Sequence, residues 1–83
     1  MEKKLTLQYD READILYVNK RPPNAEQDSE ELEDGVIARI NKTTGEIENL
    51  EILFFSAKLL RSDIMELPIN ADLRVLPKPS SVH

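Results

Sequence analysis

The chain lacks cysteine altogether, and its single histidine is the last residue, His83. Without cysteine it forms no disulfide framework, and without internal histidine it has no classical set of zinc ligands. The sequence therefore predicts no metal and no cofactor. The staples that often stabilise very small proteins are missing, so association between copies is the remaining way to add stability.

Basic residues and long apolar runs are also scarce. The formal net charge is −5 over 83 residues, and no basic cluster exceeds two residues. Nucleic-acid binders normally carry a basic face, and a membrane helix needs about 20 apolar residues. We therefore expect no nucleic-acid partner, no membrane contact and a cytoplasmic location. A chain of this length makes one small domain, which we assign to residues 1–76, followed by a mobile tail at 77–83.

Glycine occurs only twice, and both glycines fall where a hairpin needs them. Gly35 precedes the apolar run 36–40, and Gly45 lies in the polar loop before the run 47–55. Glycine accepts a positive φ without penalty, which suits the end of a type I turn. Residues 34–52 are therefore predicted to form a hairpin, around which the rest of the chain is arranged.

The patterns of two earlier segments predict a first hairpin over residues 5–19. Leu5, Leu7 and Tyr9 alternate with polar residues, which predicts a half-buried strand with these three on one face. Residues 10–14 have no periodicity and read as a turn, and 15–18 is apolar on both faces, as expected of a second strand.

Residues 19–34 have the least regular pattern. After two prolines the segment carries six acidic residues and no base, and Leu32 is its one large apolar residue. We interpret it as a solvated loop anchored by Leu32, because blocks of like charge are usually solvated. The alternative is a docking surface for a basic partner.

The last predicted strand stops alternating. Leu53 and Phe55 are predicted to face one way and Phe54 the other, and Ile37 on the neighbouring strand adds to the side of Leu53. In an antiparallel sheet with one solvent-exposed face, apolar and polar residues alternate regularly along each strand. Because the alternation stops here, we expect the second face to be covered as well. Residues 54–65 contain good helix formers at i,i+4 spacing, which favours one short helix.

These patterns predict a mainly β fold, or α+β if the C-terminal segment is helical. The expected architecture is an antiparallel β-meander of about four strands with a short C-terminal helix or irregular cover.

Few residue patterns indicate chemistry. Asp10, Glu12 and Asp14 have the spacing of oxygen ligands for a cation, but such aspartates more often cap turns. Paired carboxylates could come from Glu30, Glu31, Glu46 or Glu51, yet nothing indicates that they are buried. The terminal position of His83 disfavours a catalytic base, and the sequence offers no serine or cysteine nucleophile with a histidine in the folded region. We therefore predict no catalytic residues.

Three short patterns together resemble a known family. They are Tyr9-Asp10-x-x-Ala13-Asp14-x-Leu16-Tyr17, Glu31-Leu32-x-Asp34-Gly35-Val36-Ile37 and Gly45-x-Ile47-x-x-Leu50-Glu51-Ile52. They are similar to those of a bacterial family of small proteins, domain of unknown function number 2283, over residues 5–57. The resemblance implies a β-meander of about four strands and no known activity. The proximity of some members to toxin-like genes implies an antitoxin-like or accessory role. The chain departs from the family with Asn49 in place of glycine and with Phe54-Phe55 in place of a more polar pair.

These observations leave three hypotheses of function. The first is a non-catalytic module for protein–protein interaction that self-associates as a dimer, with its contacts at Ile37, Leu53, Phe55 and Tyr17. The second is an antitoxin-like partner that binds a basic toxin through the acidic segment. The third is a small enzyme or ligand-binding protein with its site between subunits.

Overall fold

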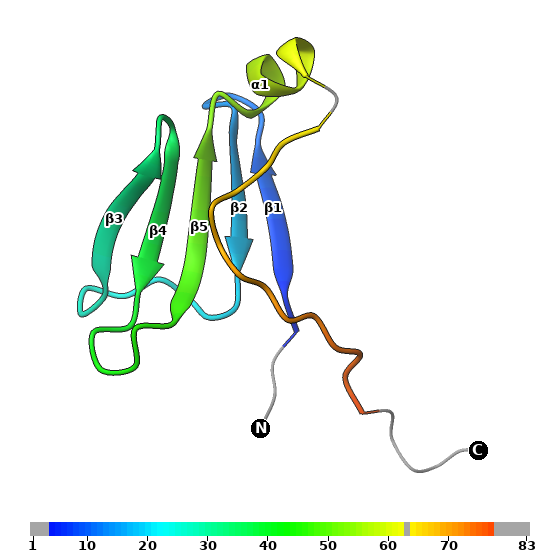
Figure 1. Cartoon of the computed structure of the whole chain (residues 1–83). Coiled ribbons are helices and arrows are strands. Elements are labelled where there is room, and N and C mark those ends of the chain that lie inside the picture. The colour runs from blue at the N-terminus through cyan, green and yellow to red at the C-terminus, as the bar shows by residue number, and fades with distance from the viewer. Residues whose placement is uncertain (1–3, 63, 78–83) are drawn as a thin grey trace.

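The chain folds into one five-stranded antiparallel sheet followed by a short helix (Figure 1). The structure is a computed structural model and describes residues 4–62 and 64–77. The elements are β1 (Thr6–Asp10), β2 (Ile15–Asn19), β3 (Asp28–Glu33), β4 (Val36–Ile40), β5 (Ile47–Leu53) and α1 (Phe55–Arg61). The predicted mainly β class and the short C-terminal helix are confirmed.

The sheet has the strand order β1-β2-β5-β4-β3. Both predicted hairpins are present, β1 with β2 and β4 with β5. The order departs from a simple meander because β2 lies beside β5, so the chain must travel to the opposite border before β3 begins. The crossover connection, residues 20–27, makes this passage beneath the ends of β5 and β4 (Figure 1).

The acidic segment is a strand, and its interpretation as a loop was wrong. Residues 28–33 form β3, which pairs with β4 at one border of the sheet. A border strand is solvated on its outer side, so its composition need not be apolar, and charges there oppose pairing with other chains. The anchoring position of Leu32 agrees with expectation, because it is half-buried while the other residues of β3 are exposed.

Both glycines lie in turns and have a positive φ, as was predicted for Gly45. Gly35 has φ +77° between β3 and β4, and Gly45 has φ +76° in the loop between β4 and β5. The amide of Gly45 donates to the carbonyl of Asn41 at 2.8 Å, which closes that loop.

The core is small and lies on one face of β4 and β5. Its fully buried apolar residues are Val36, Ala38, Leu50 and Ile52. After α1 the chain turns back and crosses in front of β5, β2 and β1 in Figure 1, with half-buried Met65, Leu67 and Ile69 along the way. This segment, residues 62–77, has no regular secondary structure where it is described.

No helix in residues 4–62 and 64–77 is long and apolar enough to cross a membrane. The tail predicted at 77–83 lies outside the described residues from position 78 onward.

Candidate functional site

Three of the four predicted contact residues share a face of the sheet. Tyr17 on β2 and Ile37 on β4 are both paired with Glu51 of β5, and Leu53 lies two residues further along β5. All three are half-buried. Between them, Glu51 accepts a hydrogen bond from Nε of Arg39 at 3.0 Å. The predicted patch is therefore an apolar surface with an ion pair at its centre.

The fourth predicted residue, Phe55, lies on the opposite face. Its ring meets that of Tyr9 edge-on, with centroids 5.9 Å apart, and the register of Tyr9 places it with Leu16 and Ile52. The strand alternation expected to align Phe55 with Leu53 ends at Phe54, which adopts a left-handed conformation with φ +53°. Phe54 is itself 63% exposed.

Sequence reasoning missed the apolar residues that the sheet leaves most open. Leu5, Leu7 and Tyr9, expected on a half-buried strand, are 46%, 63% and 42% exposed. Through the pairing of β1 with β2 they continue the face that is buried at β4 and β5. Burial therefore falls along this face, from complete at β4 to little at β1. The alternation predicted which residues share this face, but no local signal places β1 at the border of the sheet.

A polar corner joins the first hairpin to the helix. The carboxylate of Asp14 accepts hydrogen bonds from the Tyr9 hydroxyl at 2.6 Å, from the Ser56 amide at 2.9 Å and from the Ser56 hydroxyl at 2.8 Å. The Asp14 carbonyl also accepts from the amide of Phe55 at 3.0 Å. Because the N-cap residue Phe54 has no capping side chain, Asp14 supplies the cap from a distant turn.

The chemistry of this corner is that of a fold anchor. The hydrogen bond from Tyr9 and those from Ser56 hold the pKa of Asp14 below its usual value. The same carboxylate raises the pKa of the Tyr9 hydroxyl, because its charge and hydrogen bond favour the protonated phenol. An aspartate that holds its proton this weakly is a poor base for activating the Ser56 hydroxyl. The corner therefore fixes α1 against the first hairpin.

A second polar cluster surrounds Glu48 at the other end of the sheet. The register shifts there, with Arg39 opposite Asn49 but Ile40 opposite Ile47, so Glu48 is the extra residue of a β-bulge. A single amide group, Nε2 of Gln27, therefore reaches both Glu48 Oε1 at 2.7 Å and Asn49 Oδ1 at 2.9 Å.

The side chains of Glu48 and Asn49 are almost completely buried. Asn41 donates to the other oxygen of Glu48 at 3.0 Å, and Asn49 donates to the side chain of Asn19 at 2.8 Å and to the carbonyl of Arg21 at 2.6 Å. Asn49 thus ties the crossover connection to β5.

An open hollow of about 570 Å³ lies beside this cluster. It is lined by polar and charged side chains: Arg21, Asn24, Glu26, Gln27, Asn41, Lys42, Thr43 and Glu48. Hydrogen bonds from Asn41 and Gln27, helped by the charges of Arg21 and Lys20, hold the pKa of Glu48 below its usual value. The carboxylate is therefore charged near neutral pH and fully engaged by its own chain, which makes it a structural group.

The structure also shows the surroundings of the residues considered as cation ligands or acid–base groups. Asp10 caps its turn, because its Oδ1 accepts from the amides of Glu12 at 3.1 Å and Ala13 at 3.2 Å, which confirms the preferred interpretation. Among residues 4–62 and 64–77, no three acidic or histidine side chains gather as metal ligands. Glu46 pairs with Lys20, and His83 lies outside the described residues.

The comparisons with known proteins place the chain in a family. The model of the family described as "Protein of unknown function (DUF2283)" matches residues 7–56. The match spans more than half of the chain, so the chain belongs to this family, as its residue patterns indicated. Comparison with curated proteins found no match, and comparison with solved structures found none either.

Proposed function

From its membership of the DUF2283 family and the exposure of its apolar face, we propose that this chain is a non-catalytic interaction module that self-associates as a dimer. The observation that carries the proposal is the imbalance between hidden and exposed apolar side chains. Among residues 4–62 and 64–77, four apolar residues are buried, whereas nine large ones are at least 40% exposed. The exposed ones are Leu5, Leu7, Tyr9, Phe54, Leu59, Leu60, Ile64, Leu73 and Val75.

Scattered exposed leucines are ordinary on a monomer, but a contiguous patch marks an interaction surface. Three of the nine stand together at this border: Leu7 and Tyr9 on β1, where they extend the core face, and Leu5 just before the strand. A second copy of the same chain is a partner that is always present. A typical stable interface removes about 1,200–2,000 Å² of surface from solvent in total, counted over both partners. About half of that area, roughly 600–1,000 Å², comes from each copy.

The residues that carry the family likeness support a non-catalytic role. Tyr9 and Asp14 bind each other, Asp10 caps the first turn, and Gly35 and Gly45 provide the positive φ of two turns. Each of these motif residues is thus explained by the fold it builds. The likeness accordingly concerns a scaffold rather than a reactive centre.

Sedimentation velocity of the full chain at several concentrations tests the proposal. Self-association predicts a sedimentation coefficient that rises from the monomer to the dimer value between about 1 and 100 µM, a range typical of weak to moderate dimers. A monomer throughout that range would refute self-association.

We propose an antitoxin-like role as a second candidate, because β3 presents its acids along one border. Asp28, Glu30, Glu31 and Glu33 are all exposed there. A basic protein could pair with this strand, gaining main-chain hydrogen bonds together with opposite charge.

Co-expression with the product of the neighbouring gene tests this candidate. The wild type should restore growth and co-purify, and the E30Q/E31Q variant should do both less well. If the wild type forms no complex and does not restore growth, the candidate is eliminated.

A further inference from the structure

The two borders of the sheet differ in their capacity to accept another strand. The β3 border carries four exposed carboxylates, so two copies of it would repel each other. The β1 border balances one positive residue, Lys4, against one negative residue, Asp10, over residues 4–10. Figure 1 shows β1 as the outermost strand on its side, and its apolar side chains are exposed. Of the two borders, β1 is the one suited to pairing.

The sequence of β1 is complementary to itself when it runs antiparallel. With Leu7 opposite the Leu7 of a second copy, Thr6 meets Gln8 and Leu5 meets Tyr9. In the same register Lys4 meets Asp10, once on each side of the two-fold axis. All apolar residues then pair with apolar residues on one face, and opposite charges pair on the other. A two-fold interface requires this kind of self-complementarity.

Neighbouring registers lose these pairs. With Thr6 at the centre, Lys4 would face Gln8, and with Gln8 at the centre, Leu5 would face Arg11. Registers that fall between these centres would place apolar residues opposite polar ones, because side chains alternate along a strand. Only the register centred on Leu7 matches the apolar pairs and the charges together.

The geometry of Asp10 is compatible with this use. Both amides of its own turn, those of Glu12 and Ala13, bind the same oxygen, Oδ1. Among the described residues, the other oxygen, Oδ2, receives no hydrogen bond. It can therefore accept from the Lys4 ammonium of a second copy without disturbing the turn.

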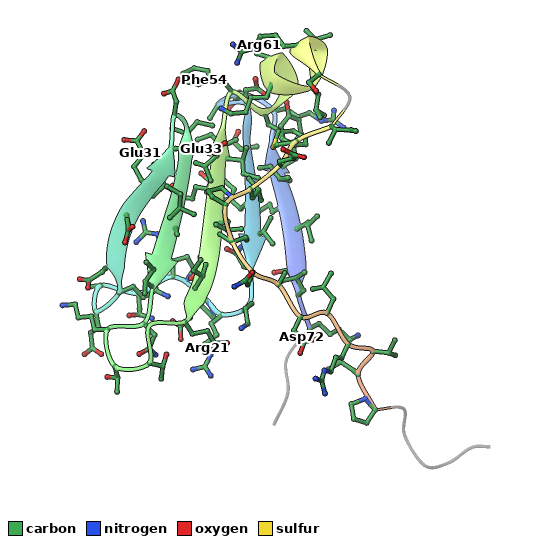
Figure 2. The ribbon with its side chains drawn as sticks, in the orientation of Figure 1. Arg21, Glu31, Glu33, Phe54, Arg61 and Asp72 are labelled. Carbon is green, nitrogen blue, oxygen red and sulfur yellow. The ribbon has the colours of Figure 1, made fainter. Side chains whose placement is uncertain are left out.

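The burial gradient adds an independent reason. The apolar face is buried at β4 and β5 and exposed at β1. Its apolar residues therefore extend beyond the part of the sheet that is shielded from solvent. Antiparallel pairing about Leu7 keeps the apolar faces of both copies on the same side of one continuous sheet. In the view of Figure 2, Asp72 marks where the segment after α1 passes the end of the sheet at which β1 begins. Leu73 and Val75, which follow Asp72 in the chain, are exposed.

We propose that two copies of the chain join at β1, antiparallel and centred on Leu7, into a ten-stranded sheet. This inference rests on the proposed self-association and names its surface.

Cysteine cross-linking of the full chain tests the register, because the natural sequence contains no cysteine. In the Leu7→Cys variant the two Cα atoms would stand about 4.5–5.5 Å apart across the axis, within the range of a disulfide. The matched control is Gln8→Cys, also exposed, whose Cα atoms would stand about 8 Å apart, beyond the limit of about 7 Å. Under mild oxidation, Leu7→Cys should form a covalent dimer and Gln8→Cys should remain a monomer on a denaturing gel.

A disruptive variant provides a second readout. Leu7→Lys places two ammonium groups together on the axis, and Leu7 is exposed enough for the monomer to fold. Its dimer dissociation constant should rise about tenfold or more, with the circular dichroism spectrum unchanged. If the wild type dimerises but Leu7→Lys dimerises equally well, or both cysteine variants cross-link alike, the β1 interface is wrong while self-association stands. A wild type that stays monomeric overturns both proposals.

Discussion

Replacement of Gly35 by alanine probes how the β3–β4 turn is joined to the helix. Gly35 has φ +77°, and a Cβ added there would lie 2.5 Å from Nζ of Lys58. That ammonium donates to the carbonyl of Leu53 at 2.7 Å. Gly45 provides a matched control, because it has φ +76° and a Cβ there would meet nothing within 4 Å. The two substitutions therefore share the backbone effect and differ in the contact with Lys58.

The magnitudes follow from these two terms. A side chain in the left-handed region costs about 1–2 kcal/mol, and the loss of glycine freedom in the unfolded chain returns about 0.4–1 kcal/mol. Gly45→Ala should thus lower the free energy of unfolding by about 1 kcal/mol, within a range of about 0–1.6 kcal/mol. Gly35→Ala should lower it by up to about 1 kcal/mol more, because Nζ at the end of the flexible Lys58 side chain must move and its hydrogen bond to Leu53 is weakened.

Urea unfolding followed by circular dichroism measures both free energies at one protein concentration. In a Lys58→Met background the ammonium is absent, so the two glycine substitutions should become equally destabilising. An equal cost of Gly35→Ala and Gly45→Ala in the wild-type background would refute the reasoning. So would an extra cost that persists beside Lys58→Met.

Three further substitutions test the polar clusters. Asn49→Ala should lower the free energy of unfolding by about 2–4 kcal/mol in urea, because three hydrogen bonds disappear from a buried site; a change within 0.5 kcal/mol would contradict this account. Glu48→Gln should flatten the loss of stability in acid. The lowered pKa of Glu48 means that its stabilisation is complete above the ordinary glutamate pKa and is lost as the pH falls through the folded value, so an unchanged pH profile would count against it. Tyr9→Phe should raise the pKa of Asp14 toward its ordinary value in a carboxyl NMR titration, because the largest cause of its lowering is removed. Tyr17→Phe should leave the Asp14 titration unchanged, and equal responses to both variants would exclude a specific effect.

The parts of the fold that the sequence predicted are those governed by local rules. Alternation identified the strands around Leu7 and Leu50, and glycine marked the turns at Gly35 and Gly45, whereas the positive φ of Asp14 and Phe54 had no such signal. The short helix was indicated by propensity and by its i,i+4 spacing, and it begins at Phe55.

What the sequence did not reveal depends on contacts far along the chain. The strand β3 forms because the outer side of β4 needs a hydrogen-bonding partner, a requirement invisible in an acidic segment whose only apolar residue is Leu32. Phe55 was assigned to the wrong face because the left-handed turn at Phe54 interrupts the alternation. The role of Asp14 as a helix cap links residues 42 positions apart, and no local pattern encodes it.

The dependence of thermal unfolding on protein concentration tests the central claim most directly, because only a folded dimer is stabilised by mass action. For two chains of 83 residues, an unfolding enthalpy of about 0.7 kcal/mol per residue gives a rise in Tm of several degrees between 1 and 100 µM, with an upper limit of about 9 °C if the dimer persists over the whole range. Self-association predicts a rise of this order in the wild type and a much smaller one in Leu7→Lys. The Tm of a monomer does not depend on protein concentration. A wild-type Tm that stays constant within about 1 °C over this range would therefore contradict the account.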